Sequence, residues 1–201
     1  MNERPILFSK PMVLALLAGT KTQTRRLAKP APTEHRLANG QSLWSFDGSY
    51  GQFAEHVFGS CMAKLAPCPY GAPGERLWVR EAWGFDSGVR GDFRPLGRND
   101  LSGMDLLTHT LYRADGGEAP RWRPSIHMPR WASRITLEVT EVRVQRLHDI
   151  SEEDALAEGC TSDPFATARE HFRVLWDHIN GAKAPWSSNP WLWCIGFRRV
   201  T

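Results

Sequence analysis

The clearest pattern in the chain is an alternation of apolar and polar residues over residues 135–146, which predicts a long β-strand. Apolar side chains occupy every second position from Ile135 to Val139, and this phase slips near Glu141. Such a slip is typical of a β-bulge or of a strand that bends at a barrel corner. Residues 191–198 are apolar on both faces, which predicts a closing strand in the middle of a sheet or barrel.

Shorter strands are predicted at residues 6–8, 76–81 and 110–113. In the second of these, Leu77 and Val79 alternate with two arginines and Trp78. We therefore expect Trp78 to lie on the opposite face of this strand from Leu77.

Three helices are predicted from capping signals and apolar spacing. The first lies between Ser9 as N-cap and Gly19 as C-terminal stop, and the second between Ser151 and Gly159. The third covers about residues 164–179. Its apolar residues recur at the i, i+3, i+4, i+7 spacing of a buried face: Phe172, Leu175, Trp176 and Ile179.

Two long stretches lack a sustained period and read as insertions, at about residues 27–69 and 84–110. A short strand at 52–57 is the only element that we expect in the first insertion. The order of elements predicts an α+β fold, with residues 1–201 forming one domain that carries both insertions.

Composition adds constraints on partners and location. The chain has 201 residues, 41% hydrophobic and 23% charged, which is ordinary for a globular protein. It has no apolar run long enough for a membrane span and no signal-peptide pattern, so we expect a cytoplasmic protein without a membrane partner. Twenty arginines against five lysines favour contacts to phosphates and bases, although a GC-rich genome produces the same bias.

The cysteines do not indicate a metal centre. Cys61, Cys68, Cys160 and Cys194 form no CxxC pair, so a zinc ribbon or redox motif is not expected. His56, Cys61 and Cys68 are possible partial ligands, but scattered reduced cysteines are the simpler interpretation. We expect no metal and no cofactor.

The densest group of chemically active side chains follows the first helix, in residues 19–26. Lys21, Thr24, Arg25 and Arg26 lie there. The dipole of the preceding helix favours cations at this place, so a structural role is one explanation. Lys21 and Thr24 would point to opposite faces of a flat strand, so a shared site requires a bent segment.

Glu158 lies at the C-terminal end of the second helix, where the helix dipole disfavours a carboxylate. A nearby Lys or Arg would compensate for this position. The alternative is an exposed, unpaired glutamate.

A second candidate region is the basic and aromatic patch in residues 121–134. We define the Arg/Trp patch as Arg121, Trp122, Arg123, Arg130, Trp131 and Arg134. Interleaved arginine and tryptophan side chains can hold phosphates and stack on unpaired bases. The tryptophans can equally be core anchors with solvated arginines around them, and the sequence leaves both interpretations open.

Several strings in the chain resemble the ASCH domain family. These are Ala-Gly-x-Lys-Thr-x-Thr, Pro-Gly-x-x-Leu-Trp-Val-Arg-Glu, Ile-Ser-x-Glu-Asp-Ala-x-x-Glu-Gly and the Trp-rich final strand. Phage and prophage members in particular carry Lys-Thr-Gln-Thr-Arg-Arg and Pro-Ser-Ile-His-Met-Pro-Arg-Trp-Ala-Ser-Arg, as this chain does. The resemblance covers about residues 5–26 and 70–200.

The resemblance implies a PUA-like fold: a small, partly open β-barrel flanked by short helices, with a cleft for RNA, modified bases or nucleosides. Small bacterial ASCH proteins include amidohydrolases that remove the acetyl group of N4-acetylcytidine with a Lys, a Thr three residues later and a Glu from a later helix. The matching residues here are Lys21, Thr24 and Glu158.

Three functions follow as hypotheses. In the first, Lys21, Thr24 and Glu158 bind the edge of a base in RNA, single-stranded nucleic acid or a modified nucleoside. The arginines of the Arg/Trp patch hold the backbone and a tryptophan stacks on the base. Arg25 or Arg26 can hold a phosphate or a developing oxyanion. In the second, Thr24 attacks an amide of an N4-acylated cytidine and Lys21 accepts its proton, which requires a lowered Lys21 pKa. In the third, Lys21 and Glu158 are only a structural ion pair. The oligomeric state stays open.

Overall fold

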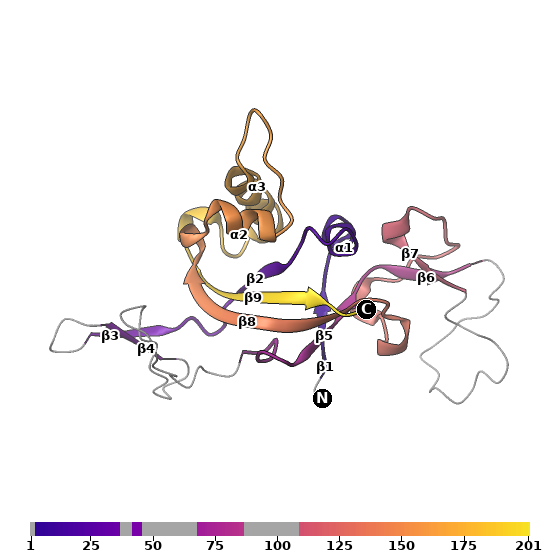
Figure 1. Ribbon diagram of the computed structural model, residues 1–201, viewed down its shortest axis with the longest axis horizontal. Coiled ribbons are helices and arrows are strands. Elements are labelled where there is room, and N and C mark those ends of the chain that lie inside the picture. Colours follow the sequence, from indigo (N-terminus) through magenta and orange to yellow (C-terminus); the bar gives the residue numbers. More distant parts are fainter. Residues whose placement is uncertain (1–2, 37–41, 46–67, 87–108) are drawn as a thin grey trace.

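The computed structural model describes residues 3–36, 42–45, 68–86 and 109–201. Its architecture is mixed α+β, built on a five-stranded sheet in which one pair of strands is parallel and the others antiparallel (Figure 1). Across the sheet the strands are β1 (Glu3–Leu7), β5 (Arg76–Arg80), β8 (Thr136–Arg146), β9 (Trp191–Arg199) and β2 (Gln23–Leu27). The described strands leave β1 and β2 as open edges and form no closed barrel.

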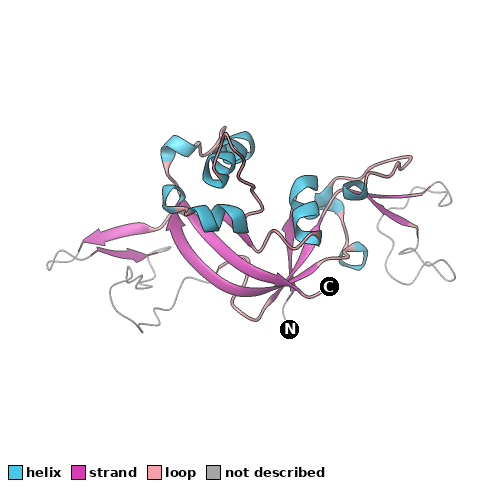
Figure 2. Cartoon of the chain, turned by 45° about the horizontal axis from the view of Figure 1, so that its top comes forward, coloured by secondary structure: helices cyan, strands magenta, loops and turns pink. Residues whose placement is uncertain are grey.

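The two longest strands confirm the sequence prediction. β8 pairs with β9 along almost its whole length, and its register shifts between Val139 and Glu141. This bulge lies where the apolar phase slips, and Figure 2 shows both strands strongly curved. β9 has neighbours on both sides, β8 and β2, which explains why a strand with two apolar faces occurs there.

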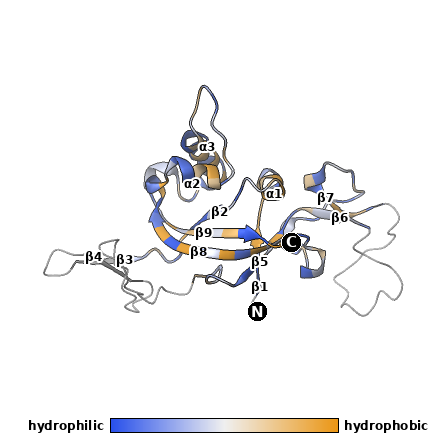
Figure 3. Cartoon of the chain, in the orientation of Figure 1, coloured by the Kyte–Doolittle hydropathy of each residue, from blue (hydrophilic) through white to orange (hydrophobic). Residues whose placement is uncertain are grey.

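The two faces of β9 pack against different helices. Trp193 and Ile195 belong to a core cluster with residues of α1 (Lys10–Leu17). Leu192 and Cys194 point to the other face and join a second cluster with α2 (Glu152–Ala157) and α3 (Ala168–Asn180). In Figure 3 the middle of β9 is hydrophobic, whereas its C-terminal end is hydrophilic.

Capping interactions set the starts of α2 and α3. The Ser151 side chain accepts a hydrogen bond from the Asp154 amide, as the sequence predicts. α3 begins at Ala168, later than expected, because Thr167 and Glu170 form a capping box there. Upstream, Asp163 accepts hydrogen bonds from two backbone amides and holds the preceding residues in a turn.

The first predicted insertion contains an unexpected strand pair, β3 (Thr33–Arg36) with β4 (Ser42–Ser45). β7 (Thr110–Tyr112) confirms the strand predicted at residues 110–113, and it pairs with β6 (Trp83–Phe85), which was not predicted. The expected strand at 52–57 lies outside the described residues. Short 3-10 helices occupy Arg113–Asp115, Ser125–His127, Arg130–Ala132, Leu147–Asp149 and Trp186–Ser188.

Trp78 of β5 is buried on the face that it shares with two arginines. Trp78 lies opposite Leu77 but is only 7% exposed. β5 is an interior strand between β1 and β8, and the Arg80 guanidinium lies 4.6 Å from the centre of the Trp78 ring. The arginine therefore covers the indole on the face opposite Leu77.

Candidate functional site

The segment between α1 and β2 bends sharply before Lys21. Gly19 has a φ of 76°, a left-handed conformation that glycine adopts without steric cost. The Thr22 amide then donates to the Ala157 carbonyl at 2.8 Å, which attaches the bend to the end of α2. The bend that a shared site for Lys21 and Thr24 requires is therefore present.

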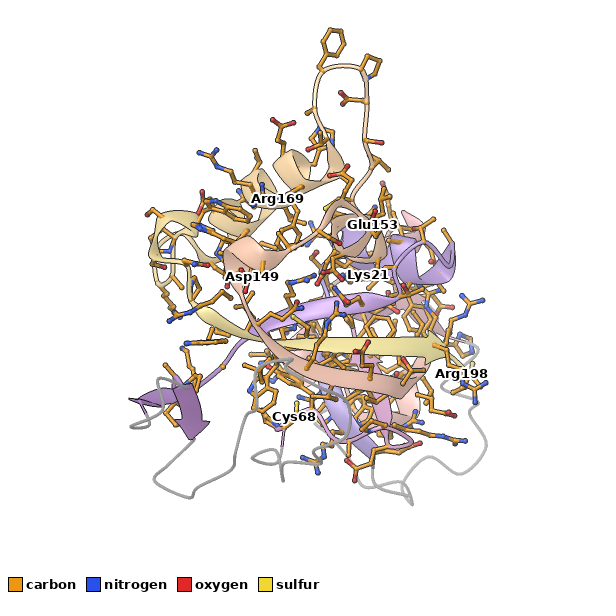
Figure 4. All side chains as sticks on the ribbon, turned by 60° about the vertical axis from the view of Figure 1, so that its left-hand side comes forward. Lys21, Cys68, Asp149, Glu153, Arg169 and Arg198 are labelled. Atoms are coloured by element: carbon orange, nitrogen blue, oxygen red, sulfur yellow. The ribbon has the colours of Figure 1, made fainter. Side chains whose placement is uncertain are left out.

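Lys21 and Glu158 meet in the interior. Lys21 Nζ lies 2.8 Å from Glu158 Oε2 and 2.7 Å from the Glu158 main-chain oxygen. The two side chains are only 1% and 5% exposed. This ion pair explains the carboxylate at the end of α2, because the ammonium offsets the unfavourable helix dipole. Figure 4 places Lys21 where the helices meet the strands.

Burial lowers the pKa of Lys21 below its ordinary value, although the negative charge of Glu158 acts in the opposite direction. The lowering of the pKa means that desolvation of the ammonium outweighs the attraction of the carboxylate. At a given pH, the neutral amine form of Lys21 is therefore more populated than that of an exposed lysine.

Arg25 occupies a buried network with two carboxylates, and its side chain is 0% exposed. Its guanidinium lies 2.7 Å from Asp154 Oδ2 and 3.4 Å from Glu158 Oε1. Arg143 also contacts Asp154, and burial of that carboxylate is outweighed by the two arginines, which lower its pKa. The network therefore fixes Glu158 from the side opposite Lys21.

Sequence reasoning missed Asp154 and Arg143, although one signal was present. Asp154 precedes Glu158 by four residues, so both carboxylates lie on one face of α2. Arg25 and Arg143 both pair with Cys194 of β9, which puts their side chains on the face covered by α2. Finding Arg143 required the strand register, which the sequence does not supply.

The Thr24 side chain points to the other face of β2. Thr24 is 4% exposed, and its hydroxyl has no hydrogen-bond partner among the described residues. It lines the same pocket as Lys21, Arg25 and Glu158. Because β2 is an edge strand, this pocket receives residues from both faces of the sheet.

The pocket has a volume of about 430 Å³, a polar floor and largely apolar walls. Phe8 and Met12 come from the start of the chain, and α3 contributes Phe172, Leu175 and Trp176. The sequence assigned the α3 residues to the core alone. Phe172 and Trp176 are buried as expected, but they also line the pocket, and Ile179 on its rim is 57% exposed.

Arg26 and Lys29 also line this pocket. Arg26 Nη2 donates to the Leu7 carbonyl at 2.6 Å, and its guanidinium lies 5.2 Å from the centre of the Phe8 ring. Lys29 follows the end of β2 and is exposed.

The Arg/Trp patch lies elsewhere, and none of its residues lines the pocket. Arg134 pairs with both Glu81 and Asp115, and Arg130 pairs with Glu3. Trp131 packs against Trp83 in a separate aromatic cluster, where the Arg123 guanidinium also lies over the Trp83 ring. Trp122 is half-buried and Arg121 is exposed. These contacts favour the anchoring interpretation for Trp131, whereas Arg130 and Arg134 form ion pairs within the protein.

Within the described ranges, no group of three His, Cys, Asp or Glu side chains is placed to hold a metal ion. Cys68, Cys160 and Cys194 are free thiols, and Cys61 and His56 lie outside these ranges. Burial raises the pKa of Cys160 and of Cys194 to about 11. No helix in the described part of the chain combines the length and apolarity needed to cross a membrane.

Comparisons with protein-family models and with curated proteins gave no match. Solved structures similar to the chain include a protein from Enterococcus faecalis V583 of the family DUF984, with 10% identity and a TM-score of 0.43, covering 100% of this chain and 82% of the other. They also include an ASCH domain from Lactobacillus crispatus JV V101, with 13% identity and a TM-score of 0.42, covering 99% of this chain and 80% of the other. The second structure carries the name of the family whose motifs the sequence resembles.

Proposed function

We propose that the pocket binds a nucleobase, either within a nucleic acid or in a modified nucleoside. One observation carries this proposal: Lys21, Thr24 and Glu158 line one pocket whose walls are aromatic and aliphatic. The volume of about 430 Å³ is in the range of small-molecule sites. The ASCH motifs in the sequence, and the PUA-like cleft that they imply, point to the same class of ligand.

The floor of the pocket matches the polar edge of a base. An ammonium has three N–H donors, and Lys21 uses two of them for Glu158, which leaves one for a base carbonyl. The Thr24 hydroxyl can both donate and accept. Phe172 and Trp176 supply apolar surface for the ring of the base.

Hydrolysis of an N4-acylated cytidine is the second candidate, favoured by the lowered pKa of Lys21. A neutral amine has two N–H groups and one lone pair, so both donors can remain on Glu158 while the lone pair accepts a proton. Thr24 Oγ1 would attack the acyl carbon as its proton passes to Lys21 Nζ. That proton then goes to the departing cytidine amine, and water hydrolyses the threonine ester to release the carboxylic acid.

Binding and turnover are separated by one set of assays. The protein is incubated with N4-acetylcytidine and with single- and double-stranded RNA and DNA, alongside Lys21→Ala, Thr24→Ala and Thr24→Val. Thr24→Val preserves the shape of the side chain and removes only its hydroxyl.

Turnover that both Lys21→Ala and Thr24→Val abolish would establish the hydrolase. Binding without product, weakened by Lys21→Ala, would establish the base-binding function alone. If N4-acetylcytidine and all four nucleic acids fail to bind and no product forms, both candidate functions are wrong. Binding that Lys21→Ala leaves unchanged would place the ligand outside this pocket.

A further inference from the structure

Two cations of the pocket, Arg26 and Lys29, form no ion pair with any carboxylate of the described residues. We propose that they form an anion subsite, so that the ligand of the pocket is a phosphorylated nucleoside rather than a free one. This inference rests on the proposed base-binding function and adds the chemical class of the ligand. The four basic side chains that line the pocket, Lys21, Arg25, Arg26 and Lys29, have different partners.

Two of these four side chains are neutralised inside the protein. Lys21 pairs with Glu158, and Arg25 pairs with Glu158 and Asp154. Both cations are therefore ion-paired inside the protein, and Arg143 shares Asp154 with Arg25. With its side chain 0% exposed, Arg25 has no surface left for a ligand phosphate, in contrast to the role that the sequence suggested for it.

Arg26 is held in place without a counter-ion. One end of its guanidinium donates to the Leu7 carbonyl, and its face lies over the Phe8 ring. Its Nε is buried and has no hydrogen-bond partner in the described part of the chain. No carboxylate of the described residues forms an ion pair with Arg26. The guanidinium is thus oriented by neutral contacts, and its positive charge is available to an anion.

Lys29 places a second charge on the same pocket. It lies three positions after Arg26, just beyond the end of β2, and is exposed. It has no ion-pair partner among the described residues. An exposed lysine is mobile and carries three donors, so it can meet an anion at the mouth of the pocket.

Two uncompensated positive charges match the charge of one phosphate monoester, which is about −1.5 to −2 at neutral pH. The apolar walls suit a base, and the cations suit a phosphate on its ribose. A free nucleoside would leave Arg26 largely buried without a counter-ion, whereas a nucleotide would satisfy both parts of the pocket.

The test is calorimetric titration of the full chain with cytidine, N4-acetylcytidine and the 5′- and 3′-monophosphates of both. We expect one of the monophosphates to bind about tenfold or more tightly than its nucleoside, since charge-assisted hydrogen bonds are the strong ones. Arg26→Lys and Lys29→Gln should each reduce this ratio several-fold. Lys29→Glu should reduce it further, and because Lys29 is exposed its variants should fold normally.

Arg198→Gln is the matched control, because it removes an exposed arginine outside the pocket. Equal affinities for nucleosides and all monophosphates would overturn the anion subsite and leave the base-binding function standing. A preference for a monophosphate that the Arg26 and Lys29 variants do not change would overturn it as well. Failure of every nucleoside and nucleotide to bind would overturn the proposed function together with this inference.

Discussion

Lys21 Nζ is bound by two oxygen atoms of the same residue, the main-chain oxygen of Glu158 at 2.7 Å and its Oε2 at 2.8 Å. The two residues are 137 positions apart, so this contact attaches the segment after α1 to the end of α2. It also fixes both side chains at the floor of the pocket. One buried pair therefore has a structural role and defines the candidate site.

The first prediction concerns the stability that this pair provides. Lys21→Met should lower the free energy of unfolding by about 3 kcal/mol, because it leaves a buried carboxylate with only a long contact to Arg25. Glu158→Gln should cost a similar amount, and the double variant should cost clearly less than the sum of the two. Urea unfolding of the four proteins measures this coupling.

Arg198→Gln breaks the pair between Arg198 and Glu138, whose arginine side chain is 66% exposed, and serves as the control. It should change stability by less than about 1 kcal/mol. Strict additivity of Lys21→Met and Glu158→Gln would contradict an energetic coupling between the two residues.

The second prediction is the pH dependence of stability that Lys21 causes. Its folded-state pKa is lowered from the value of 10.5, so between these two pKa values the unfolded chain binds more protons than the folded one. Stability attributable to Lys21 therefore rises with pH across this window and is constant above about 10.5. The difference in unfolding free energy between wild type and Lys21→Met, measured from neutral pH upward, should increase in favour of wild type.

The same titration separates the two candidate functions. Hydrolysis needs the neutral amine, so its rate should rise as pH increases through the folded-state pKa of Lys21. Binding of a base carbonyl by the ammonium should instead weaken over that range. A pH-independent difference between wild type and Lys21→Met would show that the Lys21 pKa is not lowered by folding.

The third prediction tests the wall of the pocket on α3. Ile179 lines the pocket and is 57% exposed, whereas Val174 on the same helix is 69% exposed and does not line it. Ile179→Trp should reduce ligand affinity at least about tenfold, since the indole enters the space of the ligand, a loss of about 1.4 kcal/mol or more. Val174→Trp should leave the affinity unchanged, and both should unfold within about 0.5 kcal/mol of wild type.

Titration with the ligand found in the binding assays measures both variants. Equal affinities for the two variants would mean that the ligand does not occupy the α3 side of the pocket.

The sequence predicted the parts of the fold that depend on local pattern. Alternation located β8 and its bulge, and the two apolar faces of residues 191–198 predicted the interior position of β9. The end of α3 that carries Ile179 shows the limit of this reasoning. A helical apolar face predicts burial, but it does not distinguish a side chain that packs in the core from one that borders a pocket.

The candidate site was predictable only in part, because a local sequence pattern does not show which side chains share a pocket. Lys21, Thr24 and Glu158 were identified from motifs, and their shared pocket follows from tertiary structure. The different environments of Arg25 and Arg26 were not predictable from two adjacent arginines. They diverge because neighbouring strand residues point to opposite faces, one under α2 and the other toward Phe8.

The last prediction concerns Gly159, which follows Glu158 with a φ of 88°. A Cβ atom at this position would lie 3.1 Å from Ala15 Cβ and 3.3 Å from Lys21 Cβ. Gly116 has a similar φ of 82°, and a Cβ there would meet no atom within 4 Å.

Gly116→Ala should therefore cost only the left-handed backbone strain, about 1 kcal/mol. Gly159→Ala should cost about 2–3 kcal/mol, because Lys21 must also move away from the added methyl group. It should weaken ligand binding as well, whereas Gly116→Ala should not. Urea unfolding and titration of both variants measure these differences, and equal costs would mean that the close approach of Gly159 to Lys21 does not position the site.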